Sequence, residues 1–443
     1  MRSVLRLLPA CAMLVALAGC DWLPDWFGAQ KPPPLPGTRI SVMELERSLN
    51  PDPKLADVQV RLPRPYENPA WPEDGGYPSH AMYHLKLGYE LRQVWQSNIG
   101  EGADDEQRLN SQPVVADGEI FAMDALGVVS AYRADTGAKL WSIDLTPKDK
   151  DGGAVGGGVA FDRGRLFVTT AYGDVVALDG KNGKVVWRQR IGIPFRTGPT
   201  VDDSRVFAIS YDNQVHALTE ADGKVIWTYS GVAESAELLG GASPAVQNGV
   251  VVAPLSSGEL VALRADSGRV IWSDALTRAG RVSAVGTIND IRGRPVIDRG
   301  QVYAVSHAGR MVAIDLASGD RLWEQEISGV QMPWVAGDFI YLLTADSEIA
   351  CLERRDGRVR WVRQLAKFAK PEAKTEPITW YGPVLASDRL VLVSSQGRAL
   401  SVSPYTGELL GEITLSDPAS LAPVVANATL YILTDGAELV AFR

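Results

Sequence analysis

The strongest constraint on this fold is a short turn ending in glycine, with tryptophan four residues later, that recurs along most of the chain. In six copies Gly137, Gly183, Gly223, Gly268, Gly319 and Gly357 precede Trp141, Trp187, Trp227, Trp272, Trp323 and Trp361. A degenerate seventh copy has Gly407 followed by Gly411 in place of tryptophan. The 270 residues from Gly137 to Gly407 divide into six steps that average 45 residues. That period is the length of a β-propeller blade.

Each unit also carries two alternating apolar runs before its turn, and such a pair is typical of a β-hairpin. Eight hairpins are predicted, beginning near Glu119, Arg165, Arg205, Val250, Gln301, Phe339, Arg389 and Thr429. A short segment with proline precedes nearly all of them. Because proline is tolerated on an edge strand, these segments are expected to be the innermost strands, which face the central channel. The tryptophan segments supply the outermost strands.

The last hairpin ends the chain before any turn or tryptophan, whereas residues 91–95 carry Trp95 with no hairpin before it. We therefore expect the first strand to complete the last blade and remove its open edge. The predicted fold is all-β: an eight-bladed β-propeller of four-stranded antiparallel blades over residues 90–443, closed by the N-terminal strand.

The seven tryptophans, Trp95 included, have two interpretations. A tryptophan at a fixed offset packs between neighbouring sheets and buries a large apolar area. The alternative is stacking on a cofactor or a sugar. Recurrence at the blade period favours the first interpretation, in which all seven are structural staples.

The N-terminus is typical of a secretory signal: Arg2 and Arg6 precede an apolar stretch that closes with Leu17-Ala18-Gly19-Cys20. This ending resembles the bacterial lipobox, which implies a signal peptide over residues 1–19 and lipidation of Cys20. An ordinary signal peptide with an incidental cysteine is the alternative. Residues 20–89 are rich in proline and are predicted to be an extended spacer. Only Cys20 and Cys351 would remain after cleavage, so no disulfide framework is expected.

The charge and the polar residues exclude several classes of function. The net charge of -9 offers no surplus for binding nucleic acid. The four histidines are scattered, and His80 and His84 lack the intervening glutamate of a metalloprotease motif. We therefore predict no metal site, no catalytic residues and no cofactor.

The segment Ala221-Asp222-Gly223-Lys224-Val225-Ile226-Trp227 resembles the tryptophan-docking repeat of quinoprotein dehydrogenases, and the resemblance covers about residues 91–443. Those enzymes hold pyrroloquinoline quinone (PQQ) and calcium on the propeller axis, commonly beneath a Cys-Cys disulfide. This chain has no adjacent cysteine pair. A PQQ-dependent oxidoreductase and a ligand-binding propeller lipoprotein are the alternative functions.

The combination of lipobox, spacer and eight blades resembles the BamB lipoprotein family of the outer-membrane β-barrel assembly (BAM) machinery. The resemblance implies a non-catalytic scaffold, monomeric within a hetero-complex, that binds the BamA-type insertase and nascent outer-membrane proteins. It also implies an outer-membrane anchor facing the periplasm. Asp21 resembles the inner-membrane retention signal of enteric lipoproteins, so the inner membrane is the alternative.

Long connections between blades are expected to emerge on one face of the ring, and variable loops on a regular scaffold commonly carry binding. In the BamB family, two successive loops contact the partner. By position these correspond to residues 237–244, with Leu238 and Leu239, and residues 288–295, with Asp290 and Arg292. Leu239 stands where the family has a basic residue and Arg292 where it has an acidic one. Ordinary solvated loops are the alternative.

Overall fold

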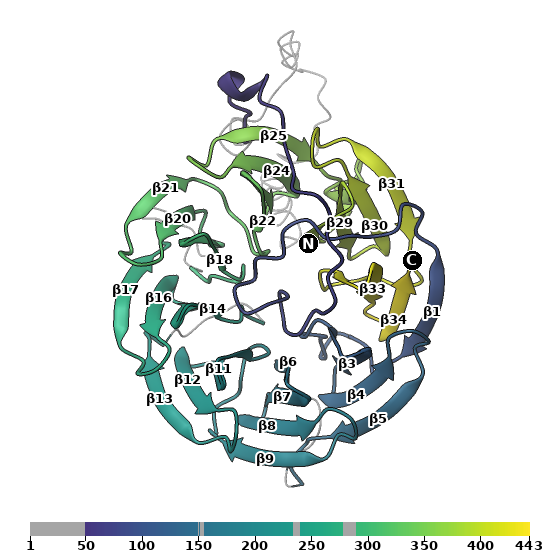
Figure 1. Cartoon of the computed structure of the whole chain (residues 1–443). Coiled ribbons are helices and arrows are strands. Elements are labelled where there is room, and N and C mark those ends of the chain that lie inside the picture. Colours follow the sequence, from purple (N-terminus) through teal and green to yellow (C-terminus); the bar gives the residue numbers. More distant parts are fainter. Residues whose placement is uncertain (1–48, 149, 151–154, 234–239, 278–288) are drawn as a thin grey trace, which may run out of the picture. The chain divides into compact units, whose positions relative to one another are not determined.

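The computed structural model describes residues 49–443 apart from residue 149 and residues 151–154, 234–239 and 278–288. The described part contains eight four-stranded antiparallel sheets arranged as the blades of a ring (Figure 1). The predicted eight-bladed propeller is therefore confirmed. The second strand of every blade also begins at the residue expected from the sequence.

The first four blades follow one another along the chain. Blade one contains β2 (Val114–Ala116), β3 (Glu119–Met123), β4 (Val128–Arg133) and β5 (Lys139–Asp144). Blade two contains β6 (Gly157–Asp162), β7 (Arg165–Thr170), β8 (Asp174–Asp179) and β9 (Val185–Arg190). Blade three contains β10 (Thr200–Asp202), β11 (Arg205–Ile209), β12 (Gln214–Thr219) and β13 (Val225–Ser230). Blade four contains β14 (Ala245–Gln247), β15 (Val250–Pro254), β16 (Glu259–Arg264) and β17 (Val270–Ala275).

The remaining blades include one extra hairpin and the closure. Blade five contains β18 (Val296–Asp298), β19 (Gln301–Val305), β20 (Met311–Asp315) and β21 (Arg321–Gln325). Blade six contains β22 (Trp334–Ala336), β23 (Phe339–Leu343), β24 (Glu348–Glu353) and β25 (Val359–Gln364). The hairpin of β26 (Phe368–Lys370) and β27 (Thr375–Pro377) leads to blade seven, which contains β28 (Trp380–Ala386), β29 (Arg389–Ser394), β30 (Arg398–Val402) and β31 (Leu409–Thr414). Blade eight contains β32 (Val424–Ala426), β33 (Thr429–Leu433), β34 (Glu438–Phe442) and, as its outer strand, β1 (Gln93–Asn98).

The N-terminal strand closes the ring as the sequence predicts. β1 pairs antiparallel with β34, and Trp95 lies opposite Ala441. Blade eight is therefore built from both ends of the propeller segment. This pairing covers an edge of β34 that would otherwise be exposed.

The seven tryptophans lie between neighbouring blades. Each indole N–H donates to a backbone carbonyl of the next blade, as Trp227 does to Ala265 at 3.0 Å. Each ring also lies against the turn glycine of that next blade, and Gly268 occupies this position against Trp227. The same pairing links Trp95, Trp141, Trp187, Trp272, Trp323 and Trp361 to Ala134, Gly180, Glu220, Leu316, Arg354 and Pro404. The core is accordingly divided into apolar clusters that each span adjacent blades.

A β-bulge precedes the tryptophan in seven of the described outer strands, and in blade seven it precedes Gly411. In blade three Ala217 pairs with Trp227 while Leu218 pairs with Val225, so Ile226 is the extra residue. The same register shift recurs in the other blades. A bulge increases the local twist and redirects a side chain. Here it accompanies the turn of the indole toward the next blade.

Residues 49–89, which the sequence predicts to be spacer, pack against the propeller. A short 3₁₀ helix, η1 (Pro53–Leu55), follows Asp52, whose backbone N–H donates to the Val359 carbonyl on the outer strand of blade six at 2.8 Å. We call residues 49–60 the strap. The chain then passes to the centre of the ring, circles it and leaves toward β1 (Figure 1).

Candidate functional site

The central channel is lined by residues 66–87, which we call the girdle. Its ends meet, because the Tyr66 N–H donates to the His84 carbonyl and the Lys86 N–H donates to the Tyr66 carbonyl. Between these ends the girdle contacts the inner strand of each blade in ring order. The contacts run from Asn68 on blade eight through Trp71, Pro72, Glu73, Pro78, Ser79 and Tyr83 to Leu85 on blade seven.

Most girdle contacts are single hydrogen bonds to the exposed edge of an inner strand. Val115 of blade one exchanges two backbone bonds with Trp71, at 2.7 and 2.9 Å. In the next blade the Phe161 N–H donates to the Pro72 carbonyl at 2.7 Å. A buried backbone group without a partner is costly. The girdle therefore supplies hydrogen-bond partners for backbone groups at the inner edges of the blades.

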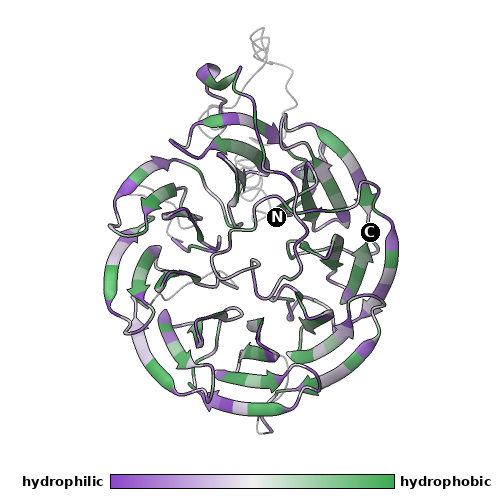
Figure 2. Cartoon of the chain, viewed as in Figure 1, coloured by the Kyte–Doolittle hydropathy of each residue, from purple (hydrophilic) through white to green (hydrophobic). Residues whose placement is uncertain are grey.

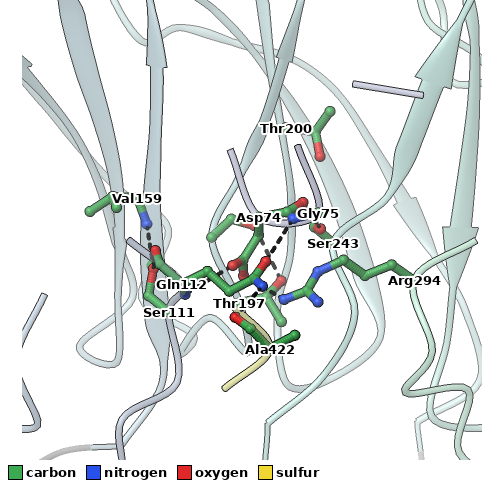
Figure 3. A network of polar contacts seen from close by, with 12 residues as sticks. Asp74, Gly75, Ser111, Gln112, Val159, Thr197, Thr200, Ser243, Arg294 and Ala422 are labelled. Carbon is green, nitrogen blue, oxygen red and sulfur yellow. Dashed lines mark hydrogen bonds and ion pairs between the residues drawn. The ribbon is translucent and has the colours of Figure 1, made fainter. Parts of the chain in front are cut away.

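A buried polar cluster fixes the girdle near blades one and five (Figure 3). Asp74 is fully buried and forms an ion pair with Arg294 at 2.9 Å. It also accepts the Gln112 backbone N–H at 3.0 Å. The Gln112 side chain accepts from the Gly75 N–H and donates to the Ala422 carbonyl, both at 2.9 Å. Segments far apart in sequence are thus joined at the axis.

Two further titratable groups of the girdle are buried. Burial raises the pKa of Glu73 well above its ordinary value, although the Val201 N–H that donates to its carboxylate opposes the change. Burial lowers the pKa of His80 to about 3, so its ring is neutral at physiological pH. His80 Nδ1 lies 2.7 Å from the Pro295 carbonyl oxygen, which only an N–H can approach favourably. These groups hold the girdle against blades three and five.

A small cavity lies beside the girdle, near the axis. The cavity there is lined by residues including Trp71, Gln112, Arg294 and Trp334, and its volume is about 20 Å³. The Trp71 and Trp334 rings stack across it with their centroids 6.3 Å apart. A cavity of this size has room for about one water molecule, whereas small-molecule sites usually measure some 300 Å³ or more.

The predicted partner loops are described only in part. Leu238 and Leu239 lie outside the described residues. Asp290 is buried and forms an ion pair with Arg196 at 3.3 Å, so its carboxylate lies inside the protein rather than on the surface. Arg292 is half-buried, and burial lowers its pKa although Asp290 opposes this. A Cβ placed on Gly240 would lie 2.9 Å from the Arg292 guanidinium, so these two residues bring the predicted loops together.

The remaining sequence predictions concern the lipid anchor, membrane-spanning helices and metal ligands. Cys20 and Asp21 precede the described region. Within residues 49–443, as far as they are described, no helix is long and apolar enough to cross a membrane. The same residues contain no group of three or more acidic, histidine or cysteine side chains placed to hold a metal ion.

The sequence interpretation missed the residues that organise the axis: Glu73, Asp74, Gln112 and Arg294. The first two sit in a proline-rich stretch without strand or helix periodicity. A usable signal was the number of apolar side chains in this stretch, among them Trp71, which is uncommon in an extended linker.

Comparison with known proteins gives one consistent family. The family described as "Outer membrane protein assembly factor BamB" matches residues 125–363. The relative of that name from Salmonella typhimurium is 30% identical over 76% of this chain and 85% of its own length. The one from Yersinia pestis is 28% identical over 79% and 88%.

Solved structures show likeness in fold. BamB from Moraxella catarrhalis superposes with a TM-score of 0.67 at 18% identity, over 80% of this chain and all of that one. The quinohemoprotein alcohol dehydrogenase of Comamonas testosteroni superposes with a TM-score of 0.67 at 14% identity, over 85% of this chain and 81% of that one. The propeller alone thus does not separate an assembly factor from an enzyme.

Proposed function

Because the chain belongs to the BamB family of outer membrane protein assembly factors, we propose that it is a non-catalytic scaffold of the outer-membrane β-barrel assembly machinery. Its role is to bind the BamA-type insertase and to help β-barrel proteins insert into the outer membrane. The observation that carries this proposal is the match at 30% identity over 85% of a BamB relative.

The insertase is proposed to dock on the face where the inter-blade loops emerge. Gly240 and Arg292 bring two of these loops together near the axis. Among the described residues no carboxylate lies within ion-pair distance of Arg292, so an acidic side chain of the partner would complement it. Asp290 serves this face indirectly, because its pairing with Arg196 supports the loop from inside. Leu238 and Leu239 are proposed as apolar contacts.

The anchor is proposed to be Cys20, released as a new N-terminus by cleavage of residues 1–19 and then acylated. Multiple acyl chains bind a membrane stably, whereas one chain binds only marginally. The anchor would hold the protein in the outer membrane, facing the periplasm. Asp21 makes the inner membrane the alternative location. Of the predicted spacer, residues 20–48 would serve as the tether, since the strap and the girdle are docked on the propeller.

The residues that occupy the propeller axis favour a scaffold function over that of a quinoprotein oxidoreductase. In that enzyme class the quinone occupies the propeller axis, where this chain places its own girdle (Figure 1). A quinone would have to displace Trp71 and the buried pair of Asp74 and Arg294. Leaving either charge buried without its partner costs about 3–5 kcal/mol.

Co-purification tests the proposal. The full-length protein, tagged at its C-terminus, is extracted from its own cells in mild detergent, and the bound proteins are identified by mass spectrometry. We expect to recover the barrel-insertion subunit, and less of it with Arg292→Ala. The matched control is Arg299→Ala, an exposed arginine at a turn on the opposite face. Absence of the insertion subunit from the unmodified protein would refute the proposal.

A further inference from the structure

The strap shows how the outer rim of a blade binds a peptide segment. The Asp52 N–H donates to the Val359 carbonyl at 2.8 Å, and the Asp52 carboxylate lies 3.4 Å from Arg358. The Arg360 side chain donates to the Val58 carbonyl at 2.7 Å. Leu49 packs on the apolar cluster that contains Val359. A carboxylate, a backbone N–H and apolar side chains therefore meet one rim together.

This contact buries a position that is open in other blades. Val359 is the first residue of its outer strand and is 7% exposed. The residues at the same place in blades two, three and four are Val185, Val225 and Val270, which are 46%, 43% and 51% exposed. These blades have the same strand register and bulge as blade six. Because the backbone repeats, the same carbonyl faces outward in each.

The charge that holds Asp52 is repeated too. Arg358 directly follows the turn glycine of blade six, and Lys184, Lys224 and Arg269 occupy that position in blades two, three and four. The residue after each valine adds more apolar surface, since Val186, Ile226 and Ile271 stand where blade six has Arg360. The rim strands thus carry apolar residues on three successive blades (Figure 2).

We propose that the rims of blades two, three and four are docking sites for an extended segment of a partner protein that combines a carboxylate with apolar residues. The carboxylate meets Lys184, Lys224 or Arg269, and the apolar side chains cover the exposed Val and Ile residues. Blade six is the copy of this site that the chain fills with its own strap. The proposal does not depend on binding of the insertase, which concerns the loop face.

A peptide with the strap sequence is the direct probe. A fluorescein-labelled peptide of residues 47–62 is titrated with the full-length protein and followed by anisotropy. We expect saturable binding, and loss of most of it when Lys184, Lys224 and Arg269 are all replaced by Glu. These side chains lie at the rim, so the triple variant should melt like the parent. Lysine in place of aspartate at position 52 of the peptide should weaken binding to the parent and restore it to the triple variant.

Three outcomes would overturn the inference: no binding, equal binding by the triple variant, or no restoration by the charge-reversed peptide. Binding that persists in the triple variant would mean that the peptide only exchanges with the strap on blade six. Co-purification of the insertion subunit with the triple variant is scored separately. If the subunit is retained while peptide binding is lost, the rim and the loop face are independent sites.

Discussion

Replacing Gly268 by alanine tests whether the packing of neighbouring blades requires a residue without a side chain where the turn contacts tryptophan. Gly268 has a φ of +67°, and a Cβ at this position would lie 2.7 Å from the Trp227 ring. Gly249, a turn glycine of the same blade, has a φ of +75° with nothing within 4 Å of its added Cβ. The two sites share the backbone strain and differ in the contact.

The expected magnitudes follow from that difference. A left-handed conformation costs an alanine about 1–2 kcal/mol, and this applies to both variants. Forcing an extra methyl against a packed ring adds about 1–3 kcal/mol, which applies only to Gly268→Ala. The lower entropy of the unfolded chain with alanine is common to both and cancels in the comparison. Gly268→Ala should therefore lose more stability than Gly249→Ala by about 1–3 kcal/mol.

Urea unfolding followed by tryptophan fluorescence measures the two variants against the parent protein. The comparison requires equal slopes of the free energy against urea, because a changed slope signals a changed unfolding reaction. Equal losses of stability in the two variants would refute the idea that the Gly268 contact with Trp227 locks blade three to blade four.

Three other perturbations probe the interior. Burial raises the pKa of Glu73 above its ordinary 4.5, so the folded state keeps this proton to a higher pH than the unfolded state, and stability falls as pH rises from about 4.5 toward the raised value. Glu73→Gln should therefore reduce the decline of the thermal melting temperature between pH 5 and 8. An unchanged decline would contradict this. Burial also raises the pKa of the Cys351 thiol, which should resist iodoacetamide at pH 8 until urea unfolds the chain, as mass spectrometry can check. Asp290→Ala removes a carboxylate that pairs with the buried Arg196 at 3.3 Å and should lower the midpoint of urea unfolding. An unchanged midpoint would contradict a supporting role for this pair.

The blades could be predicted because their determinants are local and repeated. The alternation of apolar residues marks each hairpin, and the turn glycine places the next tryptophan at a constant offset. The last hairpin lacks an outer strand with tryptophan, and the segment with Trp95 at the other end of the propeller lacks a hairpin. Together these two features predict the closure that β1 and β34 form.

The girdle could not be predicted by such reasoning. Its contacts are mostly single hydrogen bonds from an irregular backbone to a different blade each time, and they impose no period on the side chains. Proline, which suggests a free linker, also suits a chain that must stay extended while it turns around an axis. The inner strands were expected to present a free edge to the channel, and the girdle binds that edge.

The loop face was predictable as a location but not in its atomic arrangement. Sequence position places Asp290 and Arg292 in one inter-blade loop, two residues apart. It does not say which side chain turns inward, because that depends on Arg196, which is brought close only by the folded ring. The structure places Asp290 inside and leaves Arg292 half-buried.

The girdle and β1 each connect blade eight to blade one, the girdle at the axis of the ring and β1 at its rim. Blades one and eight meet where the chain would otherwise have a seam, and β1 bridges this seam at the rim through the contact of Trp95 with blade one. Residues 68–71 bridge it again at the axis, since Asn68 binds blade eight and Trp71 binds blade one. A hinge needs one fixed line about which its parts swing. Because one connection lies at the axis and the other at the rim, separating the two blades at either place strains the other connection. The ring therefore resists twisting as well as spreading.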